Sequence, residues 1–93
     1  MSTVLIIDDE PGIRDVLSDV LSDEGHTVIT AEDGPAGLGH LDARAVDLVF
    51  LDVWLPNMGG IDVLRRIRAE YPDVAVVMIS GHANIKLAVE AVK

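Results

Sequence analysis

The chain has 93 residues and a formal net charge of −9, from 16 Asp and Glu against 7 Lys and Arg. This length allows one small domain, and the lack of cysteine excludes a disulfide scaffold, a Cys-ligated zinc site and a thiol nucleophile. The acidic balance argues against direct nucleic acid binding by this segment, because phosphate backbones are bound by basic surfaces. No apolar run approaches the ~20 residues that span a membrane, and residues 1–4 carry no secretory signal. We therefore expect a cytoplasmic domain without a membrane partner.

Four apolar runs predict β-strands, at residues 4–7, 27–31, 48–51 and 74–79. The first, third and fourth runs are nearly continuous and rich in β-branched residues, which is typical of strands buried on both faces of a parallel sheet. The second run is more polar, which favours a position at the edge of the sheet.

Helical patterns lie between these runs. The first predicted helix begins near Pro11 and is ended by Gly25, and its apolar stripe consists of Ile13, Val16, Leu17, Val20 and Leu21. A shorter helix is predicted over residues 35–41, although Gly37 and Gly39 weaken it.

A third helix is predicted over residues 60–70, with Ile61, Leu64 and Ile67 facing inward, and a fourth from about residue 83 to the end of the chain. The resulting order is β-α-β-α-β-α-β-α. Such alternation predicts an α/β fold, a doubly wound parallel sheet with helices on both faces and right-handed crossovers.

Polar residues close three of the predicted strands. Asp8 and Asp9 follow the first strand, Asp52 follows the third and Ser80 follows the fourth. Each alone could be a turn or a helix cap. Because the carboxyl ends of parallel strands share one edge, where doubly wound folds build their ligand sites, we expect these four residues to converge.

A cluster of carboxylates has a chemical implication. The acids would raise one another's pKa values unless a cation neutralised them, and ligands that are all oxygen favour Mg²⁺ or a similar hard ion. An Asp beside such a metal can act as a nucleophile and form an acyl phosphate. The hydroxyl of Ser80 could then respond to the new charge, which makes the arrangement a switch.

Three ordered motifs carry a family resemblance: VLIIDDEP at residues 4–11, LDVWLPNMGG at 51–60 and ISGH at 79–82. Together they resemble the receiver domain of two-component response regulators, with details most similar to the NtrC/NtrX group. The resemblance implies a flavodoxin-like or CheY-like strand order 2-1-3-4. It also implies a phosphoacceptor domain that assists its own phosphotransfer rather than a conventional enzyme, and that relays the signal to an output domain, with transcription regulation as the expected output.

The resemblance also implies roles for the acidic residues. Asp52 would accept a phosphoryl group from a sensor histidine kinase. Asp9 would bind Mg²⁺ directly, Asp8 would bind it mainly through water, and Asp52 together with the backbone carbonyl of Trp54 would complete the protein ligands. The Trp54 side chain is expected to cover the entrance of the site.

Further matches concern the switch and the loop around the pocket. Ser80 would be the switching hydroxyl, and Gly81 the small neighbour that leaves room for the phosphoryl group. Pro56 and Gly60 match the loop that shapes the pocket floor, whereas Gly59 departs from the acidic residue often found there.

The length departs from the family pattern, because receivers usually carry a fifth strand, ending in a Lys that pairs with the phosphoryl group, and a fifth helix. Lys93 falls in the fourth predicted helix and does not match that Lys. We therefore expect a truncated receiver over residues 1–93 with impaired phosphotransfer. An open edge at residues 74–79 predicts a homodimer or a higher oligomer.

Three other functions fit parts of the pattern. A mononucleotide binder of the same architecture would need a Gly- and Ser-rich loop after the first strand, where this chain has acids. A phosphatase with an aspartyl nucleophile would place a second acid where Trp54 stands. The strongest alternative is a receiver fragment with impaired phosphorylation that acts as a protein-docking or dimerisation module.

Overall fold

The computed structural model describes residues 2–79 of the chain, in an alternating series of strands and helices. Its elements are β1 (Thr3–Ile7), α1 (Pro11–Asp23), β2 (Thr27–Ala31), α2 (Gly34–Ala43), β3 (Leu48–Asp52), α3 (Gly60–Glu70) and β4 (Ala75–Ile79). The strand and helix order predicted from the sequence is confirmed over this range. The fourth predicted helix lies outside the described residues. Within residues 2–79, every helix is too short or too polar to cross a lipid bilayer.

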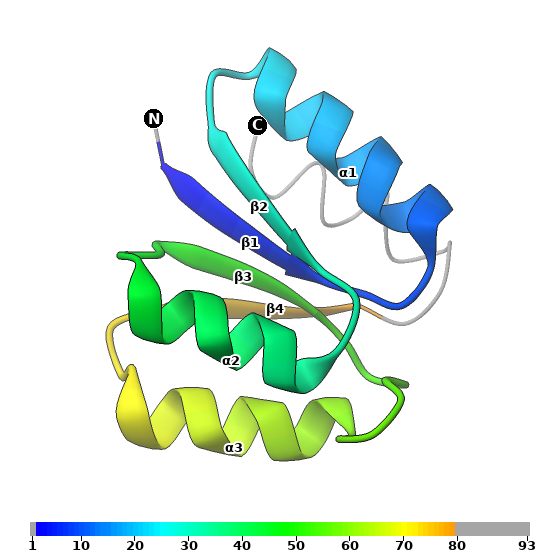
Figure 1. Cartoon of the computed structure of the whole chain (residues 1–93). Coiled ribbons are helices and arrows are strands. Elements are labelled where there is room, and N and C mark those ends of the chain that lie inside the picture. Colours follow the sequence, from blue (N-terminus) through cyan, green and yellow to red (C-terminus); the bar gives the residue numbers. More distant parts are fainter. Residues whose placement is uncertain (1, 80–93) are drawn as a thin grey trace.

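The four strands form one parallel sheet in the order β2-β1-β3-β4 (Figure 1). This is the 2-1-3-4 order that the family resemblance implied, with the more polar β2 at an edge as predicted. The apolar β1 and β3 are central and pair with each other, with Ile7 opposite Leu51. Because these two strands end at the same level, the residues that follow them are brought close together.

Helices cover both faces of the sheet (Figure 1). Side chains alternate between faces along each strand, so β1 contributes to two separate cores. Val4 and Ile6 pack with Phe50 and with residues of α1, whereas Leu5 and Ile7 belong to the core beneath α2 and α3. The sheet therefore separates two apolar cores. The polar residues that follow the strands lie at the edge formed by the strand ends.

The inward face of α1 is narrower than the sequence predicted. Ile13, Leu17 and Leu21 are buried, but Val16 is 50% exposed. The three buried residues form a single row with a spacing of four residues, which packs along the sheet. Val16 lies about 100° around the helix from Leu17, and so the prediction that Val16 faces the core was wrong.

The prediction for α3 was wrong at Ile61, which is 48% exposed. The buried row of this helix is Gly60, Val63 and Ile67. Gly60 forms the first turn against the end of β3, and this close approach fixes the rotation of the helix. Ile61, one residue further, is thereby turned toward solvent.

Local sequence signals account for the ends of the other helices. Asp33 precedes α2, and its side chain accepts a hydrogen bond of 2.8 Å from the backbone N–H of Ala36, a standard N-cap contact. Gly25 follows α1 with a φ of 90°, a conformation that favours glycine, so its predicted role in ending that helix is confirmed.

Candidate functional site: an acidic pocket at the carboxyl edge of the sheet

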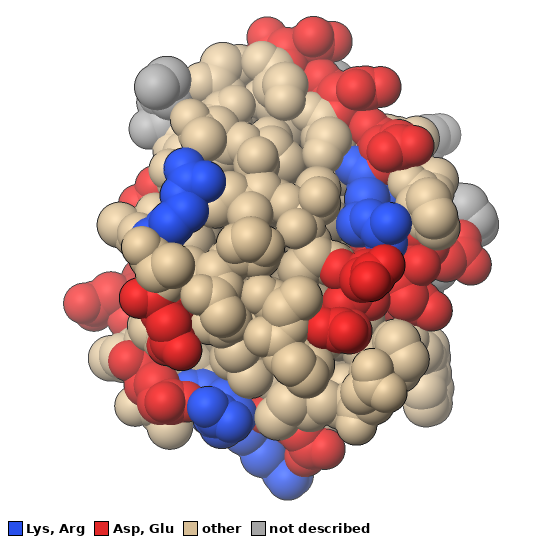
Figure 2. All heavy atoms as spheres, viewed as in Figure 1, with Lys and Arg blue, Asp and Glu red and all other residues tan. Residues whose placement is uncertain are grey.

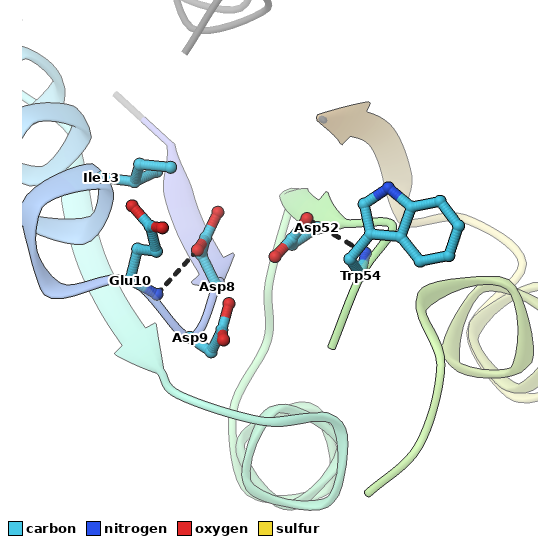
Figure 3. A pocket seen from close by; sticks show the side chains of 6 residues that line it. All are labelled: Asp8, Asp9, Glu10, Ile13, Asp52 and Trp54. Carbon is cyan, nitrogen blue, oxygen red and sulfur yellow. Dashed lines mark hydrogen bonds between the residues drawn. The ribbon is translucent and has the colours of Figure 1, made fainter. Parts of the chain in front are cut away.

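Three carboxylates meet where β1 and β3 end. Asp8 and Asp9 come from the loop after β1, and Asp52 is the last residue of β3. One carboxylate oxygen from each of the three can be chosen so that all three atoms lie within 4.8 Å of one another. Figure 3 shows Asp52 facing Asp8 and Asp9 across the pocket. The predicted convergence of these acids is therefore observed.

Backbone hydrogen bonds hold two of the three carboxylates in similar turns. The Glu10 N–H donates to Oδ1 of Asp8 at 2.9 Å, and the Trp54 N–H donates to Oδ1 of Asp52 at 3.1 Å (Figure 3). In both cases the donor lies two residues after the acid, as in an Asx turn. These bonds orient the two side chains before any ligand arrives.

The carboxylates line a cavity of about 270 Å³, together with Glu10, Ile13 and Trp54. Asp8 and Asp52 are 1% and 7% exposed, whereas Asp9 is exposed to solvent. Trp54 is 77% exposed at the border of this cavity. The pocket thus has a buried acidic floor and an entrance that a water-borne ligand can reach.

Burial makes the two inner carboxylates reluctant to ionise. The pKa of Asp52 is raised to about 6, and desolvation is the largest cause. The hydrogen bond from Trp54 opposes the increase, and the neighbouring Asp8 and Asp9 contribute to it. Desolvation also raises the pKa of Asp8, and the hydrogen bond from Glu10 partly offsets that effect. Mutual repulsion was predicted from the sequence, but burial is the larger cause.

These three side chains form a donor set that fits a hard divalent cation. All the donors are oxygens, which suits Mg²⁺ rather than a soft metal. A cation would neutralise the charge that burial and repulsion disfavour. A carboxylate of Asp52 left partly free in the same cavity is chemically able to act as a nucleophile.

The loop from β3 to α3 begins directly after Asp52 and contributes Trp54 to the lining of the pocket. The N–H of Gly60 donates to the carbonyl of Val53 at 3.1 Å, and the Met58 N–H donates to the carbonyl of Pro56 at 2.7 Å. Asn57 adopts a φ of 68°, a left-handed conformation that Asn tolerates better than most residues. The loop is therefore a tight turn that brings the start of α3 back onto the end of β3.

Some predicted site residues lie outside the described part of the chain. These are Ser80, proposed as the switching hydroxyl, and its neighbour Gly81. The strand that leads to them is described as far as Ile79, whose carbonyl accepts a 3.0 Å hydrogen bond from the Val53 N–H. This bond places the end of β4 directly beside the residue that follows Asp52.

Sequence reasoning missed one residue at this site. Arg14, on the first turns of α1, donates from Nη1 to the backbone carbonyl of Asp8 at 2.7 Å. Its charge also opposes the increase in the pKa of Asp8. The sequence contained a sign of this contact. A cation near the amino end of a helix interacts unfavourably with the helix dipole, which suggests that another contact holds Arg14 there. Figure 2 shows a basic surface area bordered by acidic side chains on the α1 side of the molecule.

The fold and the acidic pocket define a class of protein, and comparison with known families agrees. Residues 4–93 match the family model of the response regulator receiver domain. The chain belongs to this family, whose members are phosphoacceptor switches of two-component signalling systems. Receiver domains are signalling modules that bind Mg²⁺ at an acidic pocket.

Within the family, the chain is similar to NtrX proteins. It is 46% identical over 92 residues to the nitrogen assimilation regulatory protein NtrX of Azorhizobium caulinodans, covering 97% of this chain and 20% of that protein. The chain therefore spans about a fifth of the length of this curated relative. The crystal structure of the NtrX receiver domain from Brucella abortus has a TM-score of 0.81 at 46% identity, covering 96% of this chain and 76% of that one.

A more distant structural neighbour is the response regulator TrrA of Thermotoga maritima. Its crystal structure in complex with Mg²⁺–BeF has a TM-score of 0.83 at 32% identity, covering 94% of this chain and 76% of that one. A second crystal structure contains TrrA with the histidine kinase ThkA, with a TM-score of 0.81 at 34% identity over 87% of this chain and 70% of that one. The predicted family and strand order are thus confirmed.

Proposed function

We propose that Asp52 of this chain accepts a phosphoryl group from the phosphohistidine of a sensor histidine kinase, at a Mg²⁺ site formed by Asp8, Asp9 and Asp52. The observation that carries this proposal is the meeting of the three carboxylates, from the ends of two adjacent strands, in one cavity. The match to the receiver family supports the same reaction.

The transfer exchanges one bond to phosphorus for another. A carboxylate oxygen of Asp52 forms a P–O bond as the P–N bond to the kinase imidazole breaks, and the released imidazole takes up a proton from water. Mg²⁺, when bound, would neutralise charge on the acceptor and on the incoming phosphoryl group. Asp8 and Asp9 supply ligands for it, and the 3.1 Å bond from the Trp54 N–H orients Asp52. The carbonyl of Trp54 is proposed as a further ligand.

The partner of this reaction is proposed from the neighbours. TrrA has been crystallised with a histidine kinase, and the chain resembles TrrA over most of its length. We infer a kinase of the same class as the phosphodonor. The similarity to NtrX supports transcription regulation as the output of the signal. Relay through Ser80 remains part of the proposal, as do the location in the cytoplasm and the lack of direct nucleic acid binding.

Mg²⁺ and beryllofluoride test the proposal directly, because beryllofluoride bound to a carboxylate has the shape and charge of a phosphoryl group. The single tryptophan, Trp54, lies at the border of the cavity and reports on its occupation by fluorescence. We expect a fluorescence change that saturates with beryllofluoride in the presence of Mg²⁺, and labelling by a small phosphoramidate donor that alkali or hydroxylamine removes, as for an acyl phosphate. Asp52→Asn is expected to abolish both signals.

Asp73→Asn is the matched control. Asp73 is exposed and precedes β4, so it lies at the opposite edge of the parallel sheet from the pocket. The same chemical change there is expected to leave both signals intact. A wild-type chain that is folded but gives neither signal would instead favour the alternative of a docking module. Sedimentation of the same samples also measures the predicted homodimer or oligomer, which stays a prediction.

A further inference from the structure

Arg14 stands in an unfavourable place for a cation. It occupies the fourth position of α1, close to the amino end, where the helix dipole favours negative charge. The first turn of α1 contains no acidic residue, and the acid nearest to Arg14 on this side of the helix is the N-cap residue Glu10. A positive charge at this position interacts unfavourably with the helix dipole. We therefore expect a specific contact that compensates this cost.

That contact is with the backbone of a pocket residue. Nη1 of Arg14 donates to the carbonyl oxygen of Asp8 at 2.7 Å, across six positions of the chain. The Asp8 N–H donates to the carbonyl of Ala31 in β2 at 3.0 Å, and its side chain accepts from Glu10. Asp8 is therefore held from three directions, by β2, by its own loop and by α1.

We propose that Arg14 is a positioning residue for the metal site. Its hydrogen bond to the Asp8 carbonyl holds the turn after β1 in the conformation that directs Asp8 and Asp9 toward Asp52. This inference rests on the proposed function, since it assumes that Mg²⁺ binds at the three carboxylates. Arg14 itself donates to a backbone carbonyl and needs no contact with the ion. Its action is indirect, through the geometry of the loop between β1 and α1.

Two possible roles of Arg14, as a nearby positive charge or as a residue that positions the ligands, predict opposite effects of its removal on Mg²⁺ affinity. A measurement of that affinity therefore distinguishes them. If Arg14 acted only as a nearby positive charge, its removal would make the pocket more negative and Mg²⁺ would bind more tightly. If Arg14 positions the ligands, its removal loosens the loop and Mg²⁺ binds more weakly. Residues that orient metal ligands typically change affinity by about 10–100-fold when replaced.

The experiment is a Mg²⁺ titration followed by Trp54 fluorescence, without phosphodonor, at constant ionic strength. We expect Arg14→Gln to weaken Mg²⁺ binding about 10-fold, and Arg14→Lys, which retains the charge and an N–H donor, to recover part of the loss. Arg68→Gln removes the same charge from an exposed site in the last turn of α3 and is expected to bind as the wild type does. Urea unfolding without Mg²⁺ checks that each variant is folded.

Unchanged or tighter binding by a folded Arg14→Gln variant would overturn the inference, as would an Arg14→Lys variant that recovers none of the loss. These results leave the proposed function intact, because the wild-type chain still binds Mg²⁺ in the same titration. Absence of Mg²⁺ binding by the wild type would instead count against the proposed function itself.

Discussion

Gly60 lies against the backbone carbonyl of Asp52. A Cβ at position 60 would overlap that oxygen and would also lie 2.8 Å from Cα of Val53, closer than real Cβ atoms approach other atoms. The first turn of α3 is thus packed directly on the strand end that presents the proposed phosphoacceptor. The absence of a side chain at Gly60 is what permits this arrangement.

Gly60→Ala is therefore expected to destabilise the fold by about 2–4 kcal/mol, because backbone atoms cannot move aside as a flexible side chain can. Urea unfolding measures the loss. Gly12→Ala serves as the control, since a Cβ there meets no atom within 4 Å. Equal stability of the two variants would show that α3 can move away from β3 at little cost.

The two glycines of α2 are expected to respond differently to alanine. Gly39 faces open space, so Gly39→Ala adds helix propensity and is expected to stabilise the chain by about 0.5–1 kcal/mol. A Cβ on Gly37 would overlap the side chain of Ile7, which is fully buried in the core. Gly37→Ala is expected to destabilise. Thermal unfolding of both variants tests the pair, and a gain in both would contradict the packing of α2 on β1.

Without Mg²⁺, the stability of the fold is expected to depend on pH through the pocket. Burial raises the pKa of Asp52 to about 6 in the folded state, above the unfolded value of about 4. Protons therefore bind the folded state more tightly. The stability that this contributes is fully present below the unfolded pKa and is lost as pH rises through about 6.

Asp52→Asn removes this titration. Relative to the wild type in EDTA, the variant is expected to gain on the order of 2 kcal/mol of unfolding free energy between pH 4 and pH 7.5. Urea unfolding at a series of pH values measures the difference, and acids outside the pocket cancel because both chains carry them. A difference that stays constant with pH would mean that Asp52 is not desolvated.

Mg²⁺ is expected to reverse that loss of stability. A ligand that binds only the folded state, at 100 times its dissociation constant, adds about 2.7 kcal/mol. We expect Mg²⁺ to raise the unfolding temperature at pH 7.5, EDTA to return it to the metal-free value, and the effect to shrink below pH 6 as protons compete for the carboxylates. The double variant Asp8→Asn/Asp9→Asn should show no rise. A rise of the same size in that variant would place the ion elsewhere.

Local patterns in the sequence were enough to predict the order of the elements and the acids of the pocket. Continuous apolar runs indicated buried parallel strands, and three acids at the ends of two of them pointed to a shared edge. The parallel sheet confirmed this convergence because its strands all end on one side. The family motifs added the strand order.

The tertiary structure decided what the patterns left open. Rotation of α1 and α3 about their axes is set by contacts with the sheet, so Val16 and Ile61 are half exposed although they are apolar. The balance between burial and repulsion in the pKa of Asp52 depends on how deeply the strand end is covered. The hydrogen bond from Arg14 is accepted by the backbone carbonyl of Asp8. Because every residue has a backbone carbonyl, the sequence does not indicate which one Arg14 contacts. Residue types fixed the chemistry available to this chain, and packing decided which groups meet.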